Sequence, residues 1–289
     1  MNNFTVKYEE FKKTAENALF KKLSLLDCDD TLKSAMAYSV KAGGKRVRPV
    51  LLLMTADALG ADPSVALEFA CALEFIHTYS LIHDDLPSMD NDDYRRGQPT
   101  NHKVYGEAIA VLAGDALLNL AAETVIAAIK DLNSLNAAKI LFFLSGNNGM
   151  INGQVLDIKS ENSGDKSEKT LYKIHDGKTA GLIVASVLIP SLLAGKKFYN
   201  ELKRYGESLG LLFQITDDLL DETSDAATLG KTTGKDKKEN KLTFVTLYGT
   251  DKAREKELEA YKEAVRAIER IDGCELLGEF ADFIYSREK

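Results

Sequence analysis

The residues of this chain with the clearest capacity for chemistry are two clusters of aspartates. The first lies in the segment Ile82 to Gly97, IHDDLPSMDNDDYRRG, which holds five aspartates, two arginines and one histidine in sixteen residues. The second is DDLLD, Asp217 to Asp221. Oxygen-only ligands suit a hard cation, and Mg²⁺ characteristically uses one or two carboxylates together with waters and substrate phosphates. The two clusters therefore predict a phosphate group held between metal ions.

The spacing within each cluster should bring the carboxylates together. On a helix, positions i and i+4 share a face, so Asp217 and Asp221 should project to the same side. In the first cluster Pro87 lacks a backbone donor and should end or distort the helix, which lets Asp90 fold back toward Asp84. A single aspartate pair is usually only a solvated helix face. Here, however, each cluster directly follows an apolar helical stretch, CALEFIHTYSLI or LGLLFQIT, which favours a buried cation site.

Basic residues near the clusters could hold phosphate groups directly. The segment Gly43 to Pro49, GGKRVRP, presents three cations beside two glycines, and Arg95 and Arg96 follow the first cluster. Arginine binds phosphate through two parallel hydrogen bonds. On its own, a glycine pair with a lysine is more often a solvated turn. Further candidates are Lys178, Thr179, Lys231 and Lys241.

Two polar residues precede the clusters on the same helices. His77 lies seven residues before Asp84, and Gln214 lies three residues before Asp217, so each shares a helix face with its aspartate. A neutral core histidine and a core amide are the alternatives.

The elements that must position these residues are helices. Ala66 to Ile82 and Ala108 to Ile129 are rich in Ala, Leu, Glu and Ile and are too long for strands. Asp62 and Pro63 supply an N-cap and a first-turn proline for the first of them. We find no clear period-2 strand pattern. The sequence therefore predicts an all-α fold.

No boundary between domains is evident. The polar stretches Ser160 to Lys169 and Thr223 to Asn240 read as loops, and neither is long or biased enough to be a linker. The longest uncharged run, Thr179 to Gly195, contains Pro190 and is shorter than a membrane span needs, so we expect a buried core helix and no transmembrane segment. A single domain over residues 1–289 is expected.

Composition excludes several classes of protein. The net charge is −7 with both signs mixed throughout, which argues against a nucleic-acid partner. Three scattered cysteines support neither a disulfide framework nor a cysteine zinc site. The polar N-terminus lacks the apolar core of a signal peptide. A reducing cytoplasm fits these features best.

Taken in their order along the chain, the motifs resemble those of the bacterial-type short-chain trans-prenyltransferases, or polyprenyl diphosphate synthases. The resemblance is greatest to the farnesyl diphosphate synthases. The resemblance runs from GGKRVRP to the terminal SREK. It implies an isoprenoid-synthase fold, a bundle of long antiparallel helices around a deep central cavity, and usually a homodimer. Two segments depart from the family pattern: Gly-Gly-Gln-x-x-Asp reads Asn152-Gly153-Gln154 with Asp157, and Lys-x-Thr-Tyr-Pro reads Lys241-Leu-Thr-Phe-Val.

The resemblance also implies a reaction. An allylic diphosphate ionises, the double bond of isopentenyl diphosphate attacks head to tail, and the departing pyrophosphate accepts the proton. By matching motifs, Asp84 and Asp90 would hold two of three Mg²⁺ ions, with Asp85 supporting. Asp217 would hold the third with help from Asp218 and Asp221. The allylic diphosphate would be bound by Arg95, the catalytic Lys178 and Lys231, with Thr179, Gln214 and Lys241 nearby. Isopentenyl diphosphate would be bound by Lys45, Arg48, His77 and Arg96.

Product length should depend on packing below the first aspartate cluster. Tyr79 and Ser80 lie five and four residues before Asp84, about one helical turn down the wall along which the product grows. A bulky ring there should stop elongation at fifteen carbons. Alternatively, Tyr79 is a plain core residue.

Other functions are less consistent with these charges. A non-catalytic partner subunit would typically lack some aspartates or basic ligands. A helical metal-binding scaffold would not need the lysines and arginines, and a class I terpene cyclase would not need a second diphosphate site. The nearest alternative is a geranylgeranyl diphosphate synthase with the same chemistry and a deeper pocket.

Overall fold

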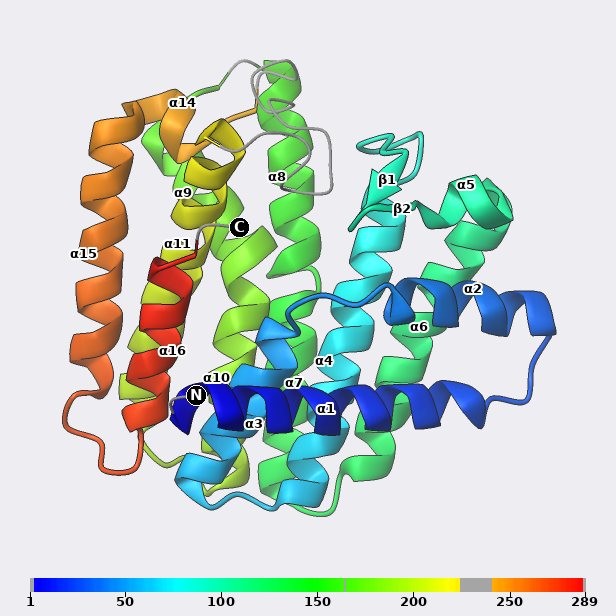
Figure 1. The fold of residues 1–289 in the computed structure, drawn as a ribbon, viewed down its shortest axis with the longest axis horizontal. Coiled ribbons are helices and arrows are strands. Elements are labelled where there is room, and N and C mark those ends of the chain that lie inside the picture. Colours follow the sequence, from blue (N-terminus) through cyan, green and yellow to red (C-terminus); the bar gives the residue numbers. More distant parts are fainter. Residues whose placement is uncertain (1–2, 164, 224–240, 288–289) are drawn as a thin grey trace.

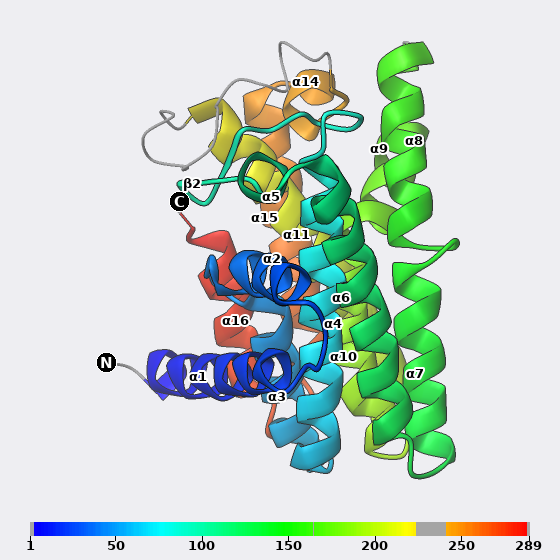
Figure 2. The same cartoon turned by 90° about the vertical axis from the view of Figure 1, so that its right-hand side faces the viewer.

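Long helices make up almost all of the structure, a computed structural model that describes residues 3–163, 165–223 and 241–287. Most of the helices run roughly parallel to one axis, and α1 and α2 cross them in both views (Figures 1 and 2). Within the described residues, the only strands are the two-residue β1 (Tyr94–Arg95) and β2 (Gln98–Pro99), which pair antiparallel. The all-α prediction is confirmed. The helices are α1 (Asn3–Ser24), α2 (Asp30–Lys41), α3 (Val47–Leu59), α4 (Pro63–Asp84), α5 (Asn101–Tyr105), α6 (Glu107–Ala128), α7 (Leu132–Ser145), α8 (Met150–Ser163), α9 (Glu168–His175), the π-helix η1 (Asp176–Ala180), α10 (Gly181–Leu193), α11 (Tyr199–Thr223), α14 (Phe244–Tyr248), α15 (Thr250–Ile268) and α16 (Glu275–Tyr285).

Helix α4 begins and ends where the sequence predicts. The Asp62 side chain accepts hydrogen bonds from the backbone amides of Ser64 and Val65, and Pro63 occupies the first turn. The helix ends at Asp84, three residues before Pro87. Its partner α6 starts near the same end of the molecule, after β1, β2 and α5 (Figure 1), so the two helices pack antiparallel. The carboxyl end of α4 is thereby placed at one end of the bundle.

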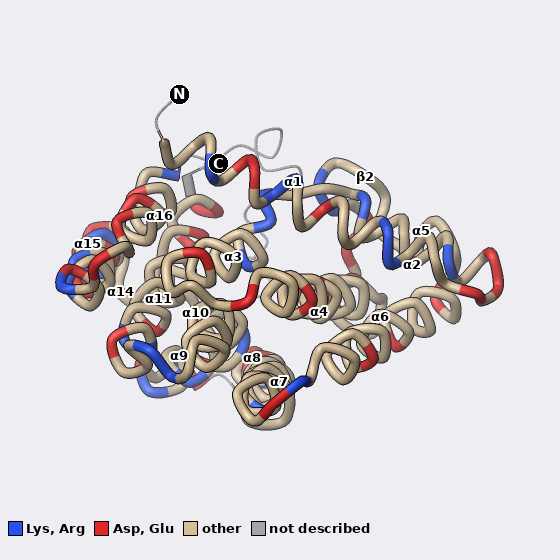
Figure 3. Tube along the Cα trace, turned by 90° about the horizontal axis from the view of Figure 1, so that it is seen from below, with Lys and Arg blue, Asp and Glu red and all other residues tan. Residues whose placement is uncertain are grey.

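Helix α10 is the centre of the core. It carries no charged residue, and nearly all of its side chains are buried against α3, α7 and α11. Figure 3 shows α10 without charge among the inner helices, whereas charged residues are frequent on the outer helix α15. The predicted core helix is confirmed, although α10 itself begins at Gly181, because a π-helical turn precedes it.

One of the two loop predictions needs revision, and the other falls mostly outside the described residues. Ser160 to Lys169 was expected to be a loop, but α8 continues to Ser163 and α9 begins at Glu168. Ser167 caps α9 by accepting a hydrogen bond from the Thr170 amide, so the polar composition marks a helix start and not a long loop. The second predicted loop starts at Thr223, which is the last residue of α11, and its residues 224–240 lie outside the described part.

Three helical stretches are long and apolar enough to cross a membrane by length and composition alone: Pro63–Asp84, Glu107–Ala128 and Glu168–Leu193. In the first and third, 72% of the apolar window is buried inside the molecule, whereas in Glu107–Ala128 only 39% is buried. The run from Thr179 to Gly195 thus overlaps the stretch Glu168–Leu193, which is longer than the uncharged run found in the sequence. Core packing accounts for two of these stretches, and α6 keeps an exposed apolar face.

Candidate active site

Two adjoining cavities lie at the carboxyl end of α4. The first, here the polar pocket, has a volume of about 260 Å³ and is lined by charged residues of α4, α8, η1 and α11. The second, here the apolar cavity, has a volume of about 550 Å³ and extends between α4, α6, α8 and α10. Leu81, Asp84 and Lys178 line both. The arrangement suits a molecule with a charged head and an apolar tail. The charged part would join the apolar part near Asp84.

The first aspartate cluster is folded as the sequence predicts. After α4 ends, the chain turns so that the Asp90 amide donates a hydrogen bond of 2.8 Å to the carbonyl of Asp84. Both residues line the polar pocket. The pKa of Asp84 is raised to about 6, chiefly by burial and also by the nearby Asp90, while Lys178 opposes the shift. Two acidic groups held together in this way favour a bound cation.

Asp85, which does not line the polar pocket, holds Arg95. Oδ1 of Asp85 accepts a hydrogen bond of 2.7 Å from Nε of Arg95 and forms an ion pair with Nη2 at 2.6 Å. Asp85 is almost fully buried, and Arg95 sits on the short strand β1. The pair fixes the Arg95 guanidinium at the rim of the polar pocket. This geometry fits the supporting role expected for Asp85.

The second cluster lies on α11 across the polar pocket. Asp217, Asp218 and Asp221 all line it. Both oxygens of Asp218 are engaged, one accepting from Gln214 Nε2 at 2.7 Å and the other from the Phe244 amide at 2.7 Å. Asp218 therefore anchors α14 to α11.

The π-helical turn η1 positions Lys178 and Thr179 between the two clusters. Lys178 Nζ donates to Asp157 at 2.5 Å, and Thr179 Oγ1 donates to Gln214 Oε1 at 2.5 Å. Although burial opposes it, the charges of Asp157 and Asp84 keep the pKa of Lys178 above its usual value. Single π-turns inside helices often occur at functional sites. Lys178 is a fixed cation facing Asp84.

Glycines allow the backbone of η1 to touch α8. A Cβ at Gly153 would lie only 2.2 Å from the Lys178 amide nitrogen, and one at Gly177 would lie 2.9 Å from Gly153 Cα. The segment Asn152-Gly153-Gln154, which departs from the family pattern, thus keeps a glycine on which this close approach depends.

Substituting Gly153 with alanine should displace Lys178. The neighbouring atoms belong to the backbone and cannot swing away, so the change should lower the free energy of unfolding by about 1–3 kcal/mol and the turnover rate by about 10²-fold. Thermal unfolding and steady-state kinetics measure both. Gly278→Ala on α16 is the matched control, because a Cβ there meets nothing within 4 Å. Equal activity in the two variants would contradict this role for Gly153.

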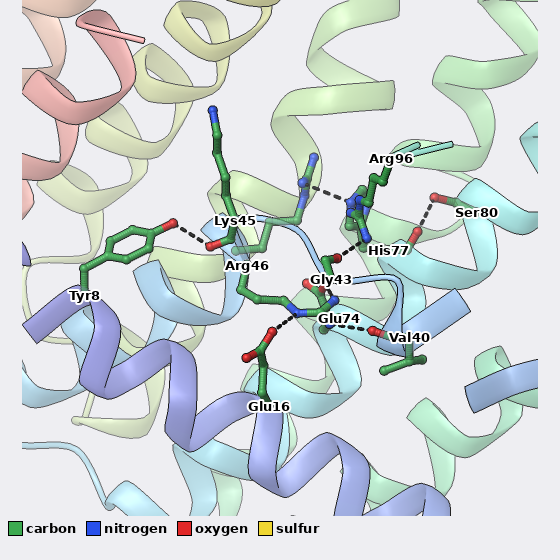
Figure 4. Close-up of polar contacts among 11 residues, drawn as sticks. Tyr8, Glu16, Val40, Gly43, Lys45, Arg46, Glu74, His77, Ser80 and Arg96 are labelled. Carbon is green, nitrogen blue, oxygen red and sulfur yellow. Dashed lines mark hydrogen bonds and ion pairs between the residues drawn. The ribbon is translucent and has the colours of Figure 1, made fainter. Parts of the chain in front are cut away.

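A second group of cations gathers at the start of α3. Arg48 Nη1 lies 3.4 Å from His77 Nε2, and Figure 4 shows His77 beside Arg96. Burial, followed by the charge of Arg48, lowers the pKa of His77 well below its usual value, so the ring is neutral. The buried Nε of Arg48 has no hydrogen-bond partner among the described residues. Burial, then the charge of Arg287, lowers the pKa of Lys45 to about 8. These groups provide donors for an anion.

The structure brings together nearly all the residues selected from the sequence. Lys241 lines the polar pocket, and its Nζ lies 3.9 Å from Asp90. Tyr79 and Ser80 line the apolar cavity. Lys231 lies outside the described residues, so its role stays a prediction.

Three residues at the site were not selected from the sequence. Asp157 is the partner of Lys178. Arg287 reaches from the carboxyl end of the chain to Asp217, with a distance of 2.9 Å between Nη2 and Oδ1, and its guanidinium lies over the Phe213 ring. Arg46 is buried beneath the Gly43 to Arg48 segment. Asp157 and Arg287 fall in motifs already noted, but only the folded chain shows their partners.

The donor set fits Mg²⁺. Among the described residues, no three acidic, histidine or cysteine side chains lie close enough to form a complete metal site by themselves. Mg²⁺ takes one or two carboxylates per ion and completes its shell with water and substrate phosphates. Asp84 with Asp90 on one wall, and Asp217 with Asp221 on the other, would hold such ions.

Comparisons with known proteins agree with this geometry. The family model described as polyprenyl synthetase matches residues 29–274. A farnesyl diphosphate synthase of Geobacillus stearothermophilus is 44% identical over 277 residues, covering 92% of each chain. A chloroplastic geranylgeranyl pyrophosphate synthase of Catharanthus roseus is 44% identical over 246 residues, covering 83% of this chain and 69% of the relative. The chain therefore belongs to the polyprenyl synthetase family.

The fold is shared as well. The crystal structure of a Helicobacter pylori geranyltransferase, complexed with magnesium and isoprenyl diphosphate, superposes with a TM-score of 0.83 at 33% identity and covers 96% of both chains. The isoprenoid-synthase fold expected from the motifs is confirmed.

Proposed function

We propose that this protein is a trans-prenyltransferase that condenses isopentenyl diphosphate head to tail with dimethylallyl and geranyl diphosphates to give farnesyl diphosphate. One observation carries the proposal: a polar pocket with carboxylates on two walls opens at Asp84 and Lys178 into an apolar cavity. Farnesyl and geranylgeranyl diphosphate synthases both occur among the relatives, so geranylgeranyl diphosphate is the second candidate product.

The allylic substrate would lie across both cavities. Its diphosphate would occupy the polar pocket beside Arg95 and Lys178, and its hydrocarbon would extend past Tyr79 into the apolar cavity. Bound Mg²⁺, three ions by family resemblance, would act as a Lewis acid on the leaving pyrophosphate. Lys178, held by Asp157, would place a fixed positive charge where negative charge develops on the leaving group.

The residues beside the junction would also orient the reacting carbons. Thr179 and Gln214 are bonded to each other, and Gln214 is fixed by Asp218, so their oxygens are rigid and lie near the head of the apolar cavity. Isopentenyl diphosphate would bind at Lys45, Arg48, His77 and Arg96, which places its double bond next to the ionising carbon.

The binding of isopentenyl diphosphate should weaken above about pH 8. Below the lowered pKa of Lys45, its ammonium group attracts the diphosphate; above that pKa the charge is lost, so the KM for isopentenyl diphosphate should rise between pH 8 and pH 9. Arg287→Gln removes a like charge and should move the onset of this rise to higher pH. The pH profile of KM for both substrates tests this, since the KM for geranyl diphosphate should stay level. A flat profile for isopentenyl diphosphate would count against the assignment of Lys45.

The decisive test of the function is a product assay. Purified protein would be incubated with dimethylallyl diphosphate and labelled isopentenyl diphosphate, with and without Mg²⁺, and the carbon number of the product measured. A metal-dependent fifteen-carbon product supports the proposal. A twenty-carbon product supports the second candidate. No product in either condition would favour a non-catalytic partner subunit.

The proposal includes a single catalytic domain that acts as a cytoplasmic homodimer. Large apolar side chains are exposed on α6, α7 and α8, among them Leu112, Ile126 and Phe143, each more than half exposed. These helices form one side of the molecule in Figure 2. A second copy packed on this side would bury the apolar face of α6, which supports a dimer over a membrane location.

A further inference from the structure

The segment Gly43 to Arg48 has an unusual backbone for a part of a binding site. It forms no helix or strand before Val47, and Gly43, Gly44 and Arg46 all have positive φ angles of 81°, 121° and 54°. Positive φ is readily adopted by glycine but is unfavourable for arginine. The segment therefore keeps this shape only because contacts with the rest of the fold impose it.

The Arg46 side chain supplies one set of these contacts from below. It is buried and donates in three directions: Nη1 to Glu74 at 2.8 Å, Nε to Glu16 at 3.1 Å and Nη2 to the Val40 carbonyl at 2.5 Å. Glu74 lies on α4 and Glu16 on α1, so one guanidinium links the segment to two helices. The guanidinium donates from three separate nitrogens to these three acceptors, whereas the donors of a lysine all lie on one nitrogen.

Tyr8 supplies a second contact from α1. Its hydroxyl donates a hydrogen bond of 2.6 Å to the carbonyl of Lys45. The ring is buried against the phenylalanines Phe4, Phe280 and Phe283, so the hydroxyl is held in place. Figure 4 shows that the side chains of Lys45 and Arg46 point to opposite sides of the segment, with Arg46 toward Glu16 and Lys45 away from it.

A third contact comes from Arg96, which follows the first aspartate cluster. Arg96 Nη1 donates to the carbonyl of Gly43, and a Cβ at Gly44 would lie 2.8 Å from the Arg96 guanidinium carbon. Arg96 and Tyr8 thus bind the backbone carbonyls of Gly43 and Lys45. The buried Arg46 side chain is bound by Glu16 and Glu74.

From these contacts we infer that Tyr8 and Arg46 are positioning residues for the isopentenyl diphosphate site: they hold the strained Gly43 to Arg48 backbone so that the cations of Lys45 and Arg48 face the anion. The inference rests on the proposed function. Neither residue touches the substrate. The N-terminal helix α1 thereby contributes to substrate affinity although it lines neither cavity.

Tyr8→Phe tests the inference with a minimal change. The variant keeps the buried ring and removes only the bond to the Lys45 carbonyl. Tyr205→Phe is the matched control, because its hydroxyl donates a similar bond of 2.7 Å to the Leu277 carbonyl, also in a buried position, far along the chain from the segment. Both variants should lower the thermal midpoint to a similar degree.

The kinetic result should differ between the two variants. In the Mg²⁺-loaded enzyme, Tyr8→Phe should raise the KM for isopentenyl diphosphate about fivefold, with the KM for geranyl diphosphate unchanged. Tyr205→Phe should change neither. An unchanged KM for isopentenyl diphosphate in Tyr8→Phe, or equal changes for both substrates, would overturn the inference while leaving the proposed function intact. A wild-type enzyme without turnover would instead remove the proposed function and this inference with it.

Arg46→Lys provides a second measurement. If it folds, it should raise the KM for isopentenyl diphosphate more than Tyr8→Phe does, because it removes two of three contacts at the strained residue. If Arg46→Lys folds and binds isopentenyl diphosphate as the wild type does, Arg46 is not a positioning residue.

Discussion

Replacing Asp84 with alanine should lower kcat/KM on the order of 10³-fold, because about 4 kcal/mol of transition-state stabilisation would be lost. Among the described residues, Asp84 is the one carboxylate that lines both cavities, and it lies near Asp90 and Lys178. Without it the first cluster keeps only Asp90 and Asp92 in the polar pocket. Leaving-group charge would then be poorly neutralised.

The fold should survive this substitution. The pKa of Asp84 is raised by burial, which means that its charged form is disfavoured in the metal-free protein, so removing it relieves repulsion with Asp90. Steady-state kinetics at saturating Mg²⁺, with thermal unfolding alongside, would measure both effects. Asp57→Ala, at an exposed position of α3, is the control and should leave both values near those of the wild type. A loss of tenfold or less in Asp84→Ala would contradict the central place given to this residue.

Local sequence rules were sufficient to predict the elements that carry the aspartates. The N-cap Asp62, the stop before Pro87 and the return of Asp90 to Asp84 each depend on backbone chemistry within a few residues. For the same reason the predicted helices needed only small changes at their ends. The π-turn at Asp176 to Ala180 could not be predicted, because it depends on its contact with Gly153 of α8, which is distant in sequence.

The partners of the charged residues were the least predictable part. Arg287 reaches Asp217 from the far end of the chain, and Arg46 is buried among glutamates of two other helices. In the sequence Arg46 is indistinguishable from its neighbours Lys45 and Arg48, since all three read as cations of one motif. Burial separates them: the outer two can meet a substrate, whereas Arg46 holds the backbone between them.

Product length should change when Tyr79 is made smaller. Tyr79 is buried on the wall of the apolar cavity, and its ring meets that of His83 edge-on, with centroids 5.7 Å apart. His83 is fixed in turn: its Nε2 donates to the Val111 carbonyl at 3.0 Å, and the ring lies so close to Gly114 that a Cβ there would be 2.1 Å from Nε2. The Tyr79 ring is therefore supported from behind and cannot easily yield to a growing chain.

Tyr79→Ala and Tyr79→Met should each shift the main product from fifteen to twenty carbons, because the removed ring leaves room that a further isoprene unit can fill. Tyr79→Phe is the matched control: it keeps the ring and loses only the hydroxyl, so its product should stay at fifteen carbons. Ser80 lines the same wall, and a larger side chain there should have the opposite effect. Ser80→Phe narrows the cavity and should shorten the product. Chromatography of the dephosphorylated products measures all four variants. If both the alanine and methionine variants still give the wild-type product, the floor of the cavity lies elsewhere and Tyr79 is only a core residue.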